Sequence, residues 1–231
     1  MPRQPKPLYL HEEIMLLALR DEKGTVELGS MYGYALGGAI LAELLLEGRI
    51  AVEEGKKKLV NLVSDQLFGE PVIDECLQKI VTAKRRASPQ SWVQRFASLK
   101  KLHHRIALGL CDRGILRADE GKVLLIFSRK IYPEINPQPE RRLIERLRKV
   151  IFGESPRVDS RTTILLSLAK SAGLLNIPFG RRELKQRKER IEQVVNGDLM
   201  GKATADAIEA VQAAIMVACI IPAITATTVS T

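Results

Sequence analysis

Cysteine is scarce in this chain. Only three of its 231 residues are cysteine, at Cys76, Cys111 and Cys219, and no two of them form a Cys-x-x-Cys pair. The odd number and the wide spacing argue against a disulfide scaffold and against a cysteine zinc site. Since each cysteine has apolar neighbours, we expect buried free thiols in a protein of a reducing compartment.

Long apolar runs are also missing. The longest uncharged stretch covers residues 210–231, but its strictly apolar part runs only over 213–224, and a bilayer span needs about 20 residues. Apolar residues recur at helical spacing over 208–219, which predicts a C-terminal core helix rather than a tail anchor. The N-terminal MPRQPKP has basic residues but no apolar core after them, so we expect no signal peptide.

The common catalytic and cofactor motifs are absent from the sequence. Residues 33–38 are rich in glycine but lack the Lys-Ser/Thr that completes a P-loop, and neither Gly-x-Ser-x-Gly nor His-Glu-x-x-His occurs. Two of the three histidines, His103 and His104, are adjacent. Neighbours on a helix point about 100° apart, so this pair cannot easily share one metal ion. We expect no cofactor, no metal and no enzyme activity.

Positive charge is present in excess. Lys and Arg outnumber Asp and Glu by 36 to 27, which gives a formal net charge of +9. This excess favours an anionic partner, such as phospholipid headgroups or nucleic acid. A basic surface that contacts only water is the alternative that charge alone leaves open.

Helical periodicity dominates the chain and predicts a mainly α protein with two short β-hairpins. The hairpins are expected over 48–60 and 114–127, each with Glu-Gly-Lys as its turn. We predict a flexible tail over 1–7, a single helical domain over 8–224 and a frayed end over 225–231. Besides an N-terminal helix from Glu12, helices are predicted over 34–47, 72–84, 91–113, 139–152, 160–172, 182–196 and 204–221.

The predicted helix over 91–113 carries a dense group of basic residues. Its apolar residues follow steps of three and four and predict a buried stripe. The basic residues are then spread over the exposed side of the helix. This face either contacts water or faces an anionic partner. The apolar residues are Trp92, Phe96, Leu99, Leu102, Ile106 and Leu110, and the basic ones include Lys100, Lys101 and Arg105.

The second predicted hairpin contains an unbroken apolar run, Val123-Leu124-Leu125-Ile126-Phe127. A half-exposed hairpin normally alternates apolar and polar residues. Either both faces of this run are buried, or part of it contacts a membrane or a partner. It is therefore our candidate for membrane insertion or self-association.

Four segments together resemble the Golgi phosphoprotein 3 family. They are residues 8–24 (LYLHEEIMLLALRDEKG), 41–50 (LAELLLEGRI), 112–116 (DRGIL) and 159–168 (DSRTTILLSL). Their order and spacing agree with that family over nearly the whole chain. The resemblance implies a mainly helical single domain and a peripheral membrane protein that recognises phosphatidylinositol 4-phosphate. Eukaryotic members act at the cytosolic face of the Golgi and bind cytosolic tails of membrane proteins there.

The resemblance also implies a headgroup site, with departures. The Trp and the first Arg of the family pocket correspond to Leu28 and Gly37 here, so both are replaced. The two other pocket arginines correspond to Lys100 and His103, and a further family Arg corresponds to Arg105. Lys gives a point charge where Arg gives a fork, and His needs protonation to act as a cation. We therefore predict that Lys100, His103 and Arg105 contact the phosphate of anionic lipids. The replaced residues and the short basic tail suggest a prokaryotic relative.

The sequence thus predicts a non-enzymatic, cytoplasmic protein that binds anionic phospholipid on membranes, as an adaptor or a homo-oligomer. The alternative is a winged-helix nucleic-acid-binding protein, because a helix, a glycine and a hairpin recur twice. Against that alternative, the predicted helix over 34–47 contains no basic residue.

Overall fold

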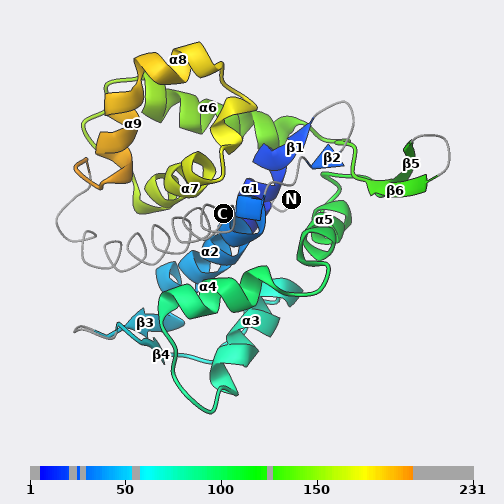
Figure 1. Cartoon of the computed structure of the whole chain (residues 1–231), viewed down its shortest axis with the longest axis vertical. Coiled ribbons are helices and arrows are strands. Elements are labelled where there is room, and N and C mark those ends of the chain that lie inside the picture. Colours follow the sequence, from blue (N-terminus) through cyan, green and yellow to red (C-terminus); the bar gives the residue numbers. More distant parts are fainter. Residues whose placement is uncertain (1–5, 21–24, 27–29, 54–57, 124–126, 200–231) are drawn as a thin grey trace, which may run out of the picture.

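The computed structural model describes residues 6–20, 25–26, 30–53, 58–123 and 127–199, and helices dominate it (Figure 1). The predicted mainly α class is therefore confirmed. Several sequence predictions fall outside the described residues: the helix over 204–221, Cys219, the ends over 1–5 and 225–231, Leu28, and the hairpin tip over 124–126.

Most predicted helices are present, and local sequence explains where they begin. The side chains of Glu70, Ser88 and Asp159 each accept a hydrogen bond from the backbone N–H three residues later, and proline follows Glu70 and Ser88 directly. Such caps satisfy the free N–H groups of a first helical turn. The helices are α1 (Leu10–Ala18), α2 (Ser30–Leu46), α3 (Pro71–Val81), α4 (Pro89–Ala97), α5 (Leu102–Asp112), α6 (Gln138–Phe152), α7 (Ser160–Ser171), α8 (Arg181–Gln186) and α9 (Lys188–Val195), with a 3-10 turn, η1 (Leu174–Asn176).

Three two-stranded antiparallel sheets accompany the helices. The hairpin predicted over 48–60 is confirmed as β3 (Ile50–Val52) and β4 (Val60–Leu62). A pair that the sequence analysis did not predict, β1 (Leu19–Arg20) and β2 (Thr25–Val26), follows α1.

The turn predicted in the second hairpin is wrong. Glu120-Gly121-Lys122 lies inside β5 (Asp119–Val123), which pairs with β6 (Phe127–Ile131) from Asp119↔Ile131 to Val123↔Phe127. The physical reason is the register: this pairing gives a ladder of five residue pairs, and more backbone groups are satisfied in a longer ladder.

The core surrounds α2. This helix carries a single charged residue, Glu43, and it packs against α1 and α7 on one side and α4 on another (Figure 1). A helix that is apolar all round has to be covered on every side. Close contact with α4 depends on Gly37, because a Cβ at this position would lie 2.6 Å from the Val93 carbonyl oxygen and 3.0 Å from the Ala97 nitrogen.

The prediction of a single helix over 91–113 is wrong, because this segment forms two helices, α4 and α5, with a break between them. Lys101, the residue before α5, has a left-handed backbone with a φ of 55°, and a left-handed residue cannot continue a right-handed helix. The break lets α4 pack on α2 while α5 packs on α1. The stripe is buried as predicted, except that Leu99, in the break, is only half-buried.

The four segments that carry the family resemblance meet in a network of charges whose carboxylates are buried. Arg113 binds Glu12, and Arg161 binds Glu43 with two hydrogen bonds of 2.9 Å. Both arginines also bind the N-terminal segment: Arg113 donates to the carbonyls of Lys6 and Pro7, and Arg161 to that of Leu8. A nearby third pair, Glu13 with Arg146 of α6, has an N–O distance of 2.9 Å. The network joins α1, α2, α6 and α7 to Arg113, the residue that follows α5.

Burial shifts the acid–base properties of this network. It raises the pKa of Glu12 and of Glu13 above the ordinary value, although the paired arginines oppose the rise. His11, fully buried beside them, has its pKa lowered to about 3 by burial first and then by the charges of Arg161 and Arg113. The histidine is therefore neutral at physiological pH. The arginines of the network are partly exposed, and Arg113, Arg146 and Arg161 line a separate cavity of about 740 Å³.

Candidate anion-binding groove

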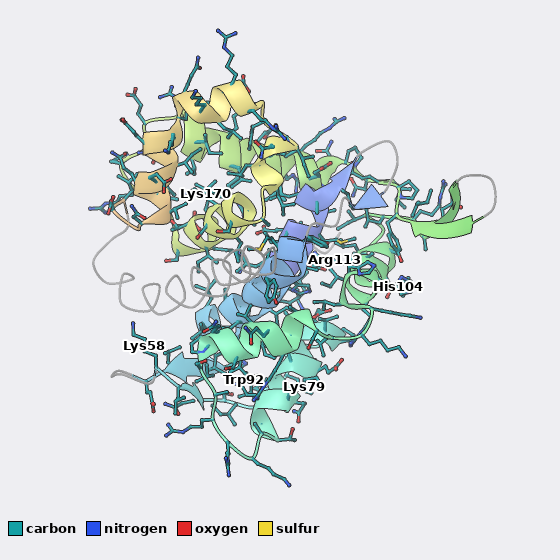
Figure 2. The ribbon with its side chains drawn as sticks, viewed as in Figure 1. Lys58, Lys79, Trp92, His104, Arg113 and Lys170 are labelled. Atoms are coloured by element: carbon teal, nitrogen blue, oxygen red, sulfur yellow. The ribbon has the colours of Figure 1, made fainter. Side chains whose placement is uncertain are left out.

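A basic groove lies between the C-terminal halves of α3 and α4. Its volume is about 840 Å³, and its walls contain five basic side chains and a single acidic one. Figure 2 shows Lys79 of α3 and Trp92 of α4 beside one another in this region. The charged lining residues are Lys79, Lys84, Arg85, Arg95, Lys100 and Glu75.

The one carboxylate of the groove is already neutralised. The Glu75 carboxylate forms ion pairs with the Arg105 guanidinium, at an N–O distance of 2.6 Å, and with the Lys79 ammonium, at 3.4 Å. Partial burial alone would raise its pKa, but the hydrogen bonds from Arg105 and Lys79 hold the pKa of Glu75 below the ordinary value. Among the described residues, Lys84, Arg85 and Lys100 have no ion-pair partner. The groove therefore has uncompensated positive charge at neutral pH.

Trp92 forms an apolar wall of the groove and fixes one of its cations. The ring is 2% exposed, and the Arg95 guanidinium lies over it at 4.6 Å from the centroid. A cation over an indole face is held by the negative face of the ring. The indole N–H of Trp92 is buried and has no acceptor within the protein.

The structure separates the three residues predicted for phosphate contact. Lys100 lies in the break between α4 and α5 and lines the groove. Arg105 lies at the edge of the groove, where it is paired with Glu75. His103 lies half-buried in the first turn of α5 and makes contacts of its own. The neighbouring His104 places its ring Nδ1 at the hydroxyl of the buried Tyr132, so it serves the fold.

The structure leaves little space for a side chain at Gly37, the position that the family resemblance related to a pocket arginine. At Gly37 even a Cβ would meet the backbone of α4. An arginine at this position would force α2 and α4 apart.

The apolar hairpin residues are only partly described. Val123 ends β5 and Phe127 begins β6, and these two residues pair through their backbones. Insertion or self-association of Val123, Leu124, Leu125, Ile126 and Phe127 stays a prediction.

Four basic residues of the groove were missed by the sequence analysis: Lys79, Lys84, Arg85 and Arg95. They come from α3, the following connection and α4, and only folding brings them to Lys100. A sequence signal existed, however. From Cys76 to Cys111 the chain has eight Lys or Arg and no Asp or Glu, which is a longer basic stretch than the one around Lys100.

The described residues include neither a membrane-spanning helix nor a metal cluster. Across the part of the chain that the structure describes, no helix is both long and apolar enough to cross a membrane. Within those same residues, no group of three or more His, Cys, Asp or Glu side chains lies close enough to hold a metal ion.

Comparison with known proteins places the chain in a family. The model of the Golgi phosphoprotein 3 family matches residues 10–211. The chain is similar to the vacuolar protein sorting-associated protein 74 of Schizosaccharomyces pombe, with 31% identity over 151 residues, covering 57% of this chain and 44% of the relative. It is also similar to the protein of the same name from Eremothecium gossypii, with 32% identity over 150 residues, covering 57% and 45%. The chain thus matches less than half the length of these relatives, while the family model covers most of the chain. It belongs to the Golgi phosphoprotein 3 family.

Proposed function

We propose that this protein is a non-enzymatic peripheral membrane protein that binds anionic phospholipid headgroups through the groove between α3 and α4. The observation that carries the proposal is the set of five basic side chains around one carboxylate that is already paired. A phosphorylated headgroup is the ligand that such a groove fits, since charge-assisted hydrogen bonds to phosphate are strong.

The arginine and lysine side chains of the groove would bind phosphate in different ways. Arg85 offers a planar fork for two phosphate oxygens, whereas Lys84 and Lys100 offer mobile point charges. We propose that Lys100, which lines the groove, contacts the phosphate. Arg105 and His103 stay predictions, and Arg105 would have to share its guanidinium with Glu75.

The ligand class is phosphoinositide-like, with phosphatidylinositol 4-phosphate as the reference lipid of the family resemblance. Because Gly37 leaves no room for the family arginine, we expect a preference for headgroup charge over strict recognition of one phosphoinositide.

Membership in the Golgi phosphoprotein 3 family, and the names of the relatives, which refer to vacuolar protein sorting, support a role in membrane trafficking. We propose an adaptor on the cytoplasmic face of a membrane, the Golgi in a eukaryotic cell, that contacts cytosolic tails of membrane proteins and associates with further copies of itself.

Vesicle sedimentation tests the proposal. Phosphatidylcholine vesicles are compared with vesicles that also contain phosphatidylserine or phosphatidylinositol 4-phosphate at matched total charge. We expect binding only to the anionic vesicles, and we expect salt to weaken it because exposed charges are screened. Equal binding to neutral vesicles, or none to any vesicle at low salt, would overturn the proposal.

A matched pair of variants tests the groove itself. The groove variant is Lys84→Ala/Arg85→Ala/Lys100→Ala, and the control is Arg181→Ala/Lys185→Ala/Lys188→Ala, which removes the same charge from exposed positions on α8 and α9. We expect only the groove variant to lose binding, since each basic residue near an anionic surface contributes about 1 kcal/mol. Equal losses would mean that net charge, and not the groove, attracts the protein. A mobility shift with duplex DNA at moderate salt tests the nucleic-acid alternative, and a shift there without vesicle binding would favour it.

A further inference from the structure

An exposed apolar loop lies next to the basic groove. Seven large apolar side chains are exposed among the residues whose burial is described, and three of them fall within six positions. They are Leu62, Val63 and Leu67, with exposed fractions of 43%, 62% and 53%. Single exposed apolar residues are ordinary on soluble proteins, but a cluster of them marks a contact surface. We name residues 62–67 the apolar loop.

The apolar loop is held in one shape by the protein around it. The Arg49 carbonyl accepts hydrogen bonds from the backbone N–H of Val63 at 2.8 Å and of Ser64 at 3.0 Å. The Arg49 side chain donates to the Gln66 carbonyl at 2.8 Å, so the loop wraps around this arginine.

The far end of the loop is anchored as well. The Asp74 carboxylate accepts from the backbone N–H of Phe68 at 2.7 Å and of Gly69 at 3.0 Å. A loop fixed at both ends does not shield its apolar side chains by collapse, and a partner that covers them meets a surface that is already ordered.

The loop and the groove belong to one end of the molecule. Val60 of β4 donates to the Ala87 carbonyl at 2.9 Å, and Arg86 binds Asn61 at 2.6 Å. The same connection between α3 and α4 carries Lys84 and Arg85 of the groove. Figure 1 shows β3, β4, α3 and α4 together at one end, away from α8 and α9.

The charge of the basic groove favours an anionic membrane as the partner of this end of the molecule. Arg49 and Arg86 lie beside the loop. The acids beside it are Asp65, Asp74 at its far end, and Glu53, which Arg86 already binds at 2.7 Å. The loop itself therefore has no excess of positive charge, and the excess at this end of the molecule comes from Lys84, Arg85 and Lys100 of the groove. A second copy of this chain docked on the same face would bring two basic grooves together, and like charges across an interface are unfavourable. An anionic bilayer instead offers headgroups to the cations and acyl chains to the apolar side chains.

We propose that the apolar loop is the membrane anchor of this protein, with Leu62, Val63 and Leu67 inserted at the boundary between headgroups and acyl chains. This inference rests on the proposed function, because the groove has to bring the protein to the membrane first. Asp65 limits the insertion to that boundary, about 5–10 Å into the bilayer surface. Headgroup charge then supplies the recruitment, and the loop supplies the part of the affinity that resists salt.

Tryptophan scanning tests the anchor directly. Val63→Trp places an indole on the loop, and Ile177→Trp places one at a position that is 42% exposed next to η1, in the α7–α9 part of the molecule. Both are measured on phosphatidylcholine–phosphatidylserine vesicles that contain brominated lipid, with the wild type giving the background of buried Trp92. We expect quenching and a blue shift for Val63→Trp alone. If the protein sediments with the vesicles but Val63→Trp is quenched no more than Ile177→Trp, the anchor proposal falls and the proposed function stands. If the wild type does not sediment with anionic vesicles, the proposed function itself falls.

A second variant separates a membrane from a protein partner. Leu62→Ser/Val63→Ser/Leu67→Ser alters only exposed side chains, and circular dichroism checks that the variant folds. We expect its vesicle affinity at high salt to fall roughly tenfold, since apolar burial is lost, while its size on gel filtration matches that of the wild type. A change of oligomeric state with unchanged vesicle affinity would instead identify a second copy as the occupant and overturn the proposal.

Discussion

The Arg161 guanidinium on α7 donates two hydrogen bonds, each 2.9 Å long, to the Glu43 carboxylate on α2, 118 residues away in the sequence. Glu43 is 1% exposed and also accepts the Leu10 N–H at 2.7 Å. Burial alone would lower the pKa of Arg161, but the hydrogen bonds and the charge of Glu43, together with the charges of nearby carboxylates, raise this pKa above its ordinary value. This pair therefore ties α1, α2 and α7 together through charges that are both satisfied.

Breaking this pair is expected to cost far more than breaking a similar pair at the surface. Glu43→Gln leaves the Arg161 charge without its partner in a largely buried place, and we expect the free energy of unfolding to fall by about 2–4 kcal/mol. The matched control is Glu75→Gln, whose pair with Arg105 is about one-third exposed on both sides and is expected to contribute under about 1 kcal/mol. Urea unfolding of both variants measures the difference. Similar losses for the two would show that burial of the Arg161–Glu43 pair has no special role.

The space between α2 and α4 determines which side chains position 37 can accommodate. Because a Cβ on Gly37 meets the backbone of α4 at 2.6 Å, Gly37→Ala is expected to destabilise the fold by about 1–3 kcal/mol through overpacking. Gly33→Ala, one turn earlier, meets its nearest neighbour at 3.9 Å and is expected to be neutral or up to about 1 kcal/mol stabilising, since alanine favours helix. Thermal unfolding decides between the two. A Gly37→Ala protein as stable as Gly33→Ala would mean that the helices separate freely and that this position admits side chains.

Sequence reasoning predicted the helices that have clear caps or a clear apolar stripe. It failed at Lys101, because the apolar stripe continues in steps of three and four across the break, and nothing in that period marks a left-handed residue. It failed at Glu120-Gly121-Lys122 for a related reason, since turn residues fit a turn but also fit a strand when a longer ladder competes.

The candidate site was predictable only in part. Lys100 was found from its basic neighbours, whereas Lys79 and Arg95 join it through the packing of α3 and α4, which no local pattern encodes. The segments of the family resemblance proved to be a network of charges around Glu43 and Arg161. The resemblance was carried by residues of this network, whereas the phosphate contacts that it implied, at Lys100, His103 and Arg105, stay predictions.

The left-handed residue in the break between α4 and α5 gives a further test. Lys101 has a φ of 55°, a conformation that costs an L-residue about 1–2 kcal/mol and glycine little. Lys101→Gly is therefore expected to be about 1 kcal/mol more stable than Lys100→Gly, which removes the same charge from the neighbouring residue, whose φ is not positive. Chemical denaturation of the two variants gives the comparison. The reverse order of stability would contradict the assignment of strain to Lys101.

Buried His11 is expected to make the fold sensitive to acid. Burial is the main cause that lowers its pKa from 6.5 to about 3. Between pH 6.5 and pH 3, His11 therefore binds a proton in the unfolded chain but not in the folded protein. Its contribution to stability is complete above pH 6.5 and is lost as the pH falls towards 3, with a slope of at most about 1.4 kcal/mol per pH unit. The raised pKa values of Glu12, Glu13 and Glu70 act with the opposite sign, so the effect of His11 has to be measured as a difference.

His11→Phe isolates that difference, because phenylalanine keeps the ring that stacks on Tyr9 at 5.9 Å but cannot bind a proton. The buried carboxylates are present in both proteins, so most of their contribution cancels when the wild type and the variant are compared at the same pH. We expect the stability of the wild type, relative to His11→Phe, to decrease steadily from pH 6.5 to pH 4 in urea unfolding. Parallel curves of stability against pH for the two proteins would show that the pKa of His11 is not lowered by folding.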